Sequence, residues 1–346
     1  MSEKLKKALK YALLLVLVAV LLFFSFRGLD WGEFLNDMKQ CRWGWVVAII
    51  AVQWIITWLR GNRWRIMLQP IRTEGTLPIT RRETYDAYAI CYLSNIAFPR
   101  SGEVVRCGLM GETRKTTFQG ALGTVVIERT WDLLCMLLAG VPLLFFGRFR
   151  DFIVEKMFRP AAGSVQLGWF WIVLIVIAAI VGIVYLVKAF HEQISRNKVG
   201  AAILKFFKGL GEGITAAFRM KNKWGFFAYT LIIWIGYWLC SLWTMRALPA
   251  FDALDGWDAL FLMVVGSLGW VVPVQGGFGA YHFIVAMTLM PVYGFDRPTG
   301  LLFATLSHES QIVQMILCGL ISLVSWALYR RKLNTSTPTT PDTPVQ

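Results

Sequence analysis

The chain has 346 residues, of which 56% are hydrophobic and only 16% charged, and its formal net charge is +14. A soluble domain carries about 25% charged residues, and several apolar runs here approach the roughly 20 residues that cross a bilayer core. The composition therefore excludes a soluble fold and predicts an all-α polytopic membrane protein. Nucleic acid is not an expected partner, because the basic residues lie in short clusters between apolar runs, as topology-determining charges do.

In chain order, the sequence predicts about six full spans and two interrupted segments. A basic N-terminus leads into an uncleaved first span, and a short polar helix with interfacial tryptophans follows it. An amphipathic surface helix is expected at 199–218. Residues 1–332 form one membrane domain, and 333–346 are a disordered Thr/Pro-rich tail. The full spans are expected at 11–26, 44–59, 119–146, 168–187, 225–245 and 301–329.

The two interrupted segments, residues 84–111 and 257–293, each contain two apolar halves separated by proline and glycine. Neither half is long enough to cross a bilayer comfortably. We therefore expect re-entrant hairpins or discontinuous helices, which membranes tolerate only where protein or a water-filled cavity satisfies the backbone. The residues expected to make the breaks are Pro99, Gly102, Pro273, Gly276, Gly277 and Gly279.

Charge distribution predicts the topology. If both interrupted segments return to their starting side, most of the 35 Lys and Arg residues lie on the side of the N-terminus. This bias predicts a bacterial cytoplasmic membrane protein with both termini in the cytoplasm. The order span, break, span then occurs twice in opposite orientations, in the halves 44–147 and 225–330. That pattern is typical of an inverted-topology repeat, although spans joined by Gly/Pro loops also occur by chance.

The segment "TVVIERTWDLL" places three charges within the predicted span 119–146, and they are Glu128, Arg129 and Asp132. Their spacing brings them to neighbouring positions on one helix. Each charge at the bilayer centre costs roughly 2.5–3.5 kcal/mol on insertion scales. The three are therefore expected to face a polar cavity, as a headgroup or proton site, or to form an internal ion-pair staple.

The segment "FPRSGEVVR" places Arg100, Glu103 and Arg106 at i, i+3 and i+6, broadly one helical face. Ser101 is positioned to cap the short helix that follows. A half-helix N-terminus with nearby arginines suits a phosphate group. The alternative is an ordinary cytoplasmic loop whose arginines only determine topology.

The segment "PVQGGFGAYH" contains Gln275 and His282, and "LSHESQ" contains His308 and Glu309 early in the last span. The glycine turn allows close backbone approach or merely tight packing. His308 could titrate near neutral pH or be a hydrogen-bonded structural residue. By spacing, the three histidines are too scattered for a metal site, so no metal and no cofactor are expected.

These three motifs, in this order, resemble the lysylphosphatidylglycerol synthase transmembrane-region family, also described as flippase-like. Larger members join this region to a cytosolic transferase that makes aminoacylated phosphatidylglycerol, and the membrane part moves that lipid between leaflets. Without that transferase, lipid-synthase activity is not expected here. The resemblance implies that the family's polar positions and glycine turn correspond to Arg100, Glu103, Arg106, Glu128, Arg129, Asp132, Gly276, Gly277 and Gly279.

Two departures from the family pattern bear on the substrate. Gln275 stands where the family commonly has proline, and His282 stands where it commonly has glutamate. The resemblance thus implies a neutral or anionic headgroup rather than a cationic aminoacyl one. The expected function is translocation of an anionic or glycosylated lipid, with protonation of Glu128 or His308 as a means of coupling. The alternative is a non-transporting scaffold or regulatory partner of a lipid-modifying enzyme or glycosyltransferase. The oligomeric state is left open.

Overall fold

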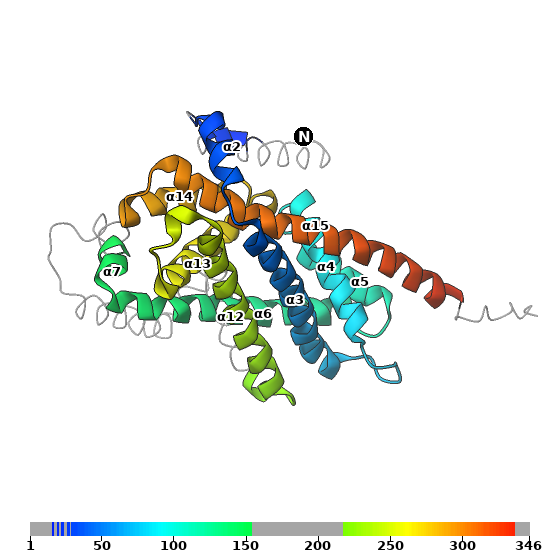
Figure 1. Cartoon of the computed structure of the whole chain (residues 1–346). Coiled ribbons are helices and arrows are strands. Elements are labelled where there is room, and N and C mark those ends of the chain that lie inside the picture. The colour runs from blue at the N-terminus through cyan, green and yellow to red at the C-terminus, as the bar shows by residue number, and fades with distance from the viewer. Residues whose placement is uncertain are drawn as a thin grey trace, which may run out of the picture.

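The structure, a computed structural model, describes residues 29–153 and 217–335 together with scattered positions before residue 29. Within these ranges the chain is helical and has no strand (Figure 1). Short 3-10 turns lie at Gln69–Ile71 (η1), Val141–Phe145 (η2), Pro249–Phe251 (η4) and Gln275–Gly277 (η5). The α-helices are α2 (Trp31–Lys39), α3 (Trp43–Leu68), α4 (Arg81–Ala97), α5 (Gly102–Glu112), α6 (Phe118–Gly140), α7 (Gly147–Ile153), α12 (Lys223–Ala247), α13 (Gly256–Val271), α14 (Ala280–Tyr293) and α15 (Arg297–Thr335).

Three of the described helices are long and apolar enough to cross a membrane, at Trp43–Ile71, Lys223–Ala247 and Arg297–Arg331. They coincide with the spans predicted at 44–59, 225–245 and 301–329. The predicted span 119–146 is not among them, and its α-helix ends at Gly140, where a 3-10 turn containing a proline follows. The predicted span 168–187 lies outside the described residues. Most of the predicted span 11–26 and of the predicted helix 199–218 also lies outside them, and residues 217 and 218 are helical.

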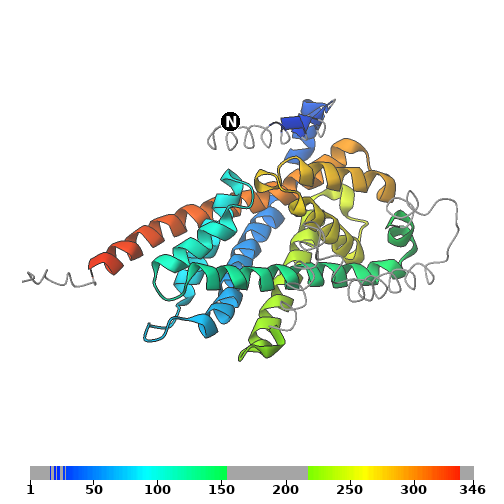
Figure 2. The same ribbon diagram turned by 180° about the vertical axis from the view of Figure 1, so that it is seen from behind.

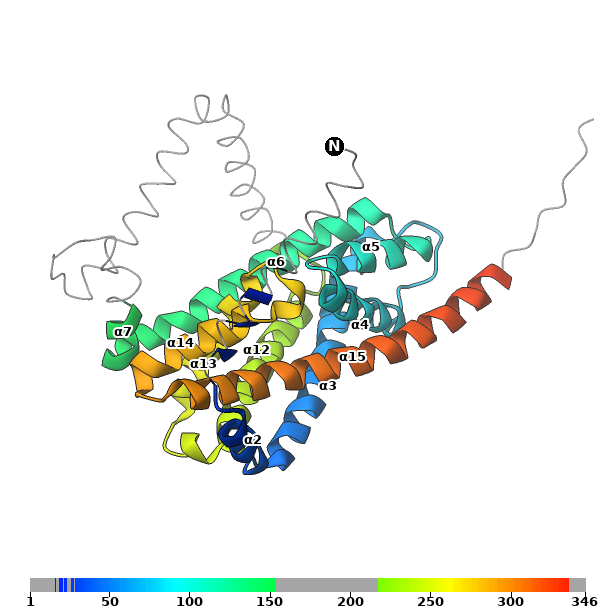
Figure 3. The same ribbon diagram turned by 90° about the horizontal axis from the view of Figure 1, so that it is seen from above.

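The bundle has two long helices on opposite sides and the other principal helices between them. Figure 3 shows α6 and α15 on these two sides, with α3, α4, α12, α13 and α14 in the middle. Seen from behind in Figure 2, α6 crosses in front of α3 and α12. α3 packs along α12, while α15 packs along both α4 and α14. Segments from the two halves of the chain therefore share one core.

The predicted span 44–59 is longer than expected. Its helix, α3, continues past Leu59 to Leu68. No proline occurs in this stretch before Pro70, which lies in the 3-10 turn after α3, and the helix continues through Gly61. The extra turns carry Arg60 and Arg63 into the interior, where they are 8% and 0% exposed.

The first interrupted segment is two helices, as predicted, with a turn between them. Gly102 begins α5 against α4, and a Cβ atom at this position would lie 2.1 Å from the carbonyl oxygen of Cys91. Ser101 does not cap α5, contrary to prediction. Its hydroxyl donates back to the Ser94 and Phe98 carbonyl oxygens, and the Gly102 N–H donates to the side-chain oxygen of Asn95 instead.

The second interrupted segment is also two helices, α13 and α14, joined by a glycine turn. Gly276, Gly277 and Gly279 have φ values of 54°, 78° and 75°, which side chains with a Cβ rarely adopt. The two breaks touch each other, since the Arg100 guanidinium donates a hydrogen bond to the carbonyl oxygen of Val271. Such a meeting is what an inverted repeat would produce, and the repeat itself remains a prediction.

The C-terminal helix runs further than the predicted span. α15 reaches Thr335, so residues 333–335 of the predicted disordered tail are helical. The remaining tail residues lie outside the part of the chain that the structure describes.

Candidate functional site

The centre of the candidate site is Glu128 on α6, whose side chain is fully buried. Its carboxylate accepts a hydrogen bond from Arg106 Nη1 at 3.1 Å and another from the Tyr88 hydroxyl. The Arg106 guanidinium lies over the rings of Trp64 and Tyr88, 4.7 and 4.5 Å from their centroids. A desolvated guanidinium is stabilised by such faces as well as by its counter-ion. Helices α3, α4, α5 and α6 are therefore joined at one ion pair.

One helical turn further along α6, Asp132 makes a second set of ion pairs. Arg63 Nη2 lies 2.8 Å from its carboxylate, and Arg60 contacts the other oxygen. Arg60 also donates to the Tyr92 hydroxyl at 2.9 Å, and Arg63 donates to the Thr230 hydroxyl at 3.3 Å. These contacts join α3 to α4, α6 and α12.

Two further charged side chains, at one edge of these ion pairs, are partly exposed at the protein surface. The Arg129 side chain is 44% exposed and that of Glu103 is 22% exposed, whereas their neighbours Arg106 and Glu128 are fully buried. Arg129 Nη2 lies 3.1 Å from Glu103 Oε1 and 3.6 Å from Glu128 Oε1. Glu103 Oε2 is buried and has no hydrogen-bond partner among the described residues. Arg129 therefore connects the buried ion pairs to the surface.

We refer to these seven ionised side chains as the charged cluster. It has four arginines and three carboxylates, so it carries one excess positive charge. Several of its N–H groups also lack a hydrogen-bond partner among the described residues, namely Nε of Arg60, Arg63 and Arg106 and Nη2 of Arg106. Buried charge in apolar surroundings favours the approach of an opposite charge. The members are Arg60, Arg63, Glu103, Arg106, Glu128, Arg129 and Asp132.

Five of the residues predicted from the two motifs belong to the charged cluster, but Arg100 does not. α5 begins at Gly102, so the helical spacing from Arg106 and Glu103 does not extend back to Arg100. Arg100 is exposed in the turn, at φ 55°, and reaches the second break instead. Arg60 and Arg63 also belong to the charged cluster but were not predicted. Their signal was an i, i+3 arginine pair that follows an apolar stretch without an intervening proline.

The residues predicted around the glycine turn form a separate group. His308 Nε2 is 2.8 Å from the Gly276 carbonyl oxygen, and His308 Nδ1 is 2.9 Å from Glu309 Oε1. His282 Nε2 lies 3.6 Å from the same Glu309 oxygen. Gln275 is buried, and its side-chain oxygen has no partner among the described residues.

By spacing, the three histidines look too scattered for a metal site, but the structure brings two of them together. The packing of α14 against α15 brings one ligand atom each of His282, His308 and Glu309 within 4.8 Å of one another. His191 lies outside the described residues.

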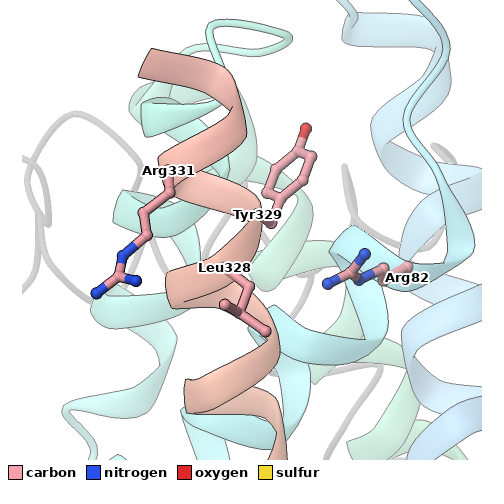
Figure 4. A pocket seen from close by; sticks show the side chains of 4 residues that line it. All are labelled: Arg82, Leu328, Tyr329 and Arg331. Carbon is pink, nitrogen blue, oxygen red and sulfur yellow. The ribbon is translucent and has the colours of Figure 1, made fainter. Parts of the chain in front are cut away.

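A surface hollow of about 420 Å³ lies elsewhere, between the start of α4 and the end of α15 (Figure 4). Arg82, Leu328, Tyr329 and Arg331 line it. Arg82 donates hydrogen bonds to Ser325 on α15. No member of the charged cluster lines this hollow, so its arginine and aromatic side chains are a separate feature of the surface.

In a comparison with known families, the family model of the lysylphosphatidylglycerol synthase TM region matches residues 11–319, which include both breaks, the charged cluster and the histidine group. No curated protein and no solved structure matches the chain.

Proposed function

Because the chain belongs to the lysylphosphatidylglycerol synthase TM region family, a membrane domain tied to lipid synthesis or flipping, we propose that it moves a polar lipid between membrane leaflets. It is a multi-pass membrane protein, with helices long enough to cross the bilayer. Our proposal places it in a bacterial cytoplasmic membrane with both termini in the cytoplasm, and assigns it no lipid-synthase activity. Coupling to protons through Glu128 or His308 remains a prediction.

The observation that carries the proposal is the excess positive charge of the charged cluster. A phospholipid or a polyprenyl phosphate sugar presents a phosphate, whose negative charge would balance that excess. Arginine binds phosphate through two parallel N–H groups. Arg129 is the arginine of the cluster with the largest exposed fraction, so a headgroup would meet it first. The lipid tails would stay in the bilayer while the headgroup passed this edge.

A non-transporting role, as scaffold or regulatory partner of a lipid-modifying enzyme, is favoured by a different observation. Glu128 and Asp132 already have arginine partners within the protein, so their ion pairs hold helices together without any ligand. The two roles differ at Arg129. In a scaffold, loss of this half-exposed side chain should have little effect, since exposed ion pairs contribute about 0–1 kcal/mol to stability. In a transporter, the same loss should impair binding of the lipid headgroup.

The test is lipid flipping in liposomes that contain the purified protein. Wild type and R129Q are compared on fluorescent phosphatidylglycerol, phosphatidylcholine and a glycosylated polyprenyl phosphate. R42Q is the matched control, because the Arg42 side chain is 46% exposed and also pairs with a carboxylate. We expect the wild-type protein to flip the two lipids with net negative charge faster than phosphatidylcholine. R129Q should slow it about tenfold or more, since a hydrogen bond between charged groups contributes about 1.5–3 kcal/mol.

Thermal unfolding of each variant in detergent provides the second readout. R129Q should unfold at nearly the wild-type temperature, so that lost flipping reports on the headgroup and not on folding. The proposal is overturned if folded wild-type protein flips none of the lipids, with or without a pH gradient. It is equally overturned if R129Q flips lipid as fast as R42Q.

A further inference from the structure

The group around the glycine turn lies outside the charged cluster, and the proposed binding of the lipid phosphate does not involve it. His282 is in the first turn of α14, and His308 and Glu309 are neighbours on α15. The two histidines are 2% and 0% exposed, whereas the Glu309 side chain is 39% exposed. The group is thus buried on one side and reachable from the surface through Glu309.

The hydrogen bonds of His308 determine which of its ring nitrogens carries a proton. A carbonyl oxygen only accepts, so Nε2, which is 2.8 Å from the Gly276 carbonyl, must be the N–H donor. In the neutral ring, Nδ1 then presents a lone pair toward Glu309 Oε1 at 2.9 Å. An ionised carboxylate oxygen also only accepts. Two acceptors at this distance need a cation or a proton between them.

A second imidazole is directed at the same oxygen. His282 Nε2 is 3.6 Å from Glu309 Oε1, and His282 Nδ1 is buried without a hydrogen-bond partner among the described residues. A shared proton between His308 and Glu309 would leave His282 unused. One metal ion, by contrast, would take a donor atom from each of the three side chains, which all lie within 4.8 Å.

The residues around His308 hold its imidazole ring in a fixed orientation, as is expected of a metal ligand. The Trp270 ring stacks on His308 with a centroid distance of 5.3 Å, and the rings of Phe278 and Tyr281 lie 4.9 and 5.2 Å from it. Metal-ligating histidines almost always donate their other N–H to a carboxylate or a backbone carbonyl, which fixes the tautomer. The bond from His308 to Gly276 is of this kind.

We propose that His282, His308 and Glu309 bind one divalent transition-metal ion of the Zn²⁺ class. Two imidazoles and one carboxylate are a ligand set that suits Zn²⁺ and related ions. The ion would connect α14 to α15, and through the His308–Gly276 bond it would hold the glycine turn of the second break in place. It would also give this break a fixed positive charge.

The test uses protein purified through a tag other than polyhistidine, treated with a chelator and then titrated with Co²⁺. Co²⁺ replaces Zn²⁺ in such sites, and its visible absorbance reports nitrogen and oxygen ligands. We expect one Co²⁺ ion per chain, displaced by Zn²⁺. H282Q and E309Q should each weaken binding by at least tenfold. H191Q, which changes the third histidine, is the control and should bind as wild type does.

A second measurement separates ligand loss from misfolding. E309Q changes a partly exposed side chain, so it should keep the wild-type unfolding temperature when no metal is present. Added Zn²⁺ should raise the unfolding temperature of wild type and of H191Q, and should leave E309Q unchanged. The proposal is overturned if wild type binds Co²⁺ only far below one ion per chain, as adventitious metal would. Equal binding by H282Q, E309Q and wild type would overturn it too, leaving a His308–Glu309 proton pair.

Discussion

Neutralising Glu128 tests whether the charged cluster holds the helices together. Glu128 and Arg106 are both fully buried, and their ion pair at 3.1 Å is supported by the Tyr88 hydroxyl. In E128Q the new amide N–H₂ faces donors, and Arg106 keeps its charge without its counter-ion. Removing one partner of a buried ion pair costs about 3–5 kcal/mol. We therefore expect the folded-to-unfolded ratio of E128Q to fall by a factor of roughly 150 to 5,000.

A double-mutant cycle separates the ion pair from the general cost of changing buried residues. R106Q alone should cost about as much as E128Q, since it leaves the carboxylate unpaired. The double variant removes both charges, so its loss should be smaller than the sum of the two single losses by at least about 1 kcal/mol. The assay is equilibrium unfolding in mixed micelles, followed by the fluorescence of the 16 tryptophans.

The control cycle uses the exposed pair Arg42 and Asp252, whose side chains are each 46% exposed. R42Q and D252N should show a weaker coupling than E128Q and R106Q, because solvent screens an exposed pair. If the coupling of E128Q and R106Q were no larger than that of the control cycle, the buried pair would not act as a unit. Flipping by E128Q should be measured at temperatures where it remains folded, so that lost activity does not merely report unfolding.

Two further changes probe packing and pH. G102A should lower the free energy of unfolding by about 1–3 kcal/mol, because its methyl group would lie 2.1 Å from the backbone oxygen of Cys91. G108A is the control in the same helix: its Cβ would have nothing within 4 Å, so it should raise the free energy of unfolding by up to about 1 kcal/mol. Equal thermal unfolding of the two variants would contradict this packing. The hydrogen bond from Arg42 lowers the pKa of Asp252, so its stabilisation is present above the ordinary aspartate pKa of about 4 and disappears as the pH falls through the lowered value. The unfolding temperatures of wild type and D252N should therefore differ at pH 7 and converge at low pH, and a constant difference would refute the linkage.

Local sequence signals predicted the helices and the breaks well. Proline and glycine act on their own backbone, so the turns at Pro99 and at Gly276 to Gly279 could be read directly. The ends of helices were harder to predict. A charged residue such as Arg60 indicates the start of a loop only if charged side chains are assumed to face solvent. The partners that make its burial tolerable come from α6 and α4, far along the sequence.

The site was predictable in part for the same reason. Glu128, Arg129 and Asp132 were identified because three charges in an apolar helix are costly without partners. Which arginines pair with them depends on tertiary packing, so Arg63 was missed, and Arg100, which was expected on the helical face of Arg106, lies in the turn before that helix. The proximity of His282 to His308 was not predicted, because spacing along the chain says little about residues on two helices that pack together.

The backbone of the two breaks explains part of this polar clustering without any ligand. An interrupted helix leaves N–H and carbonyl groups that need partners inside a membrane. Arg100, His308 and Asn95 each bond such a group at a break, so a structural role is sufficient for those particular hydrogen bonds. The contacts of Arg129 and His282 described above are to carboxylates instead, and Arg129 is partly open to the surface. The functional hypotheses therefore depend most on Arg129 for lipid and on His282 for metal, which are the positions that R129Q and H282Q test.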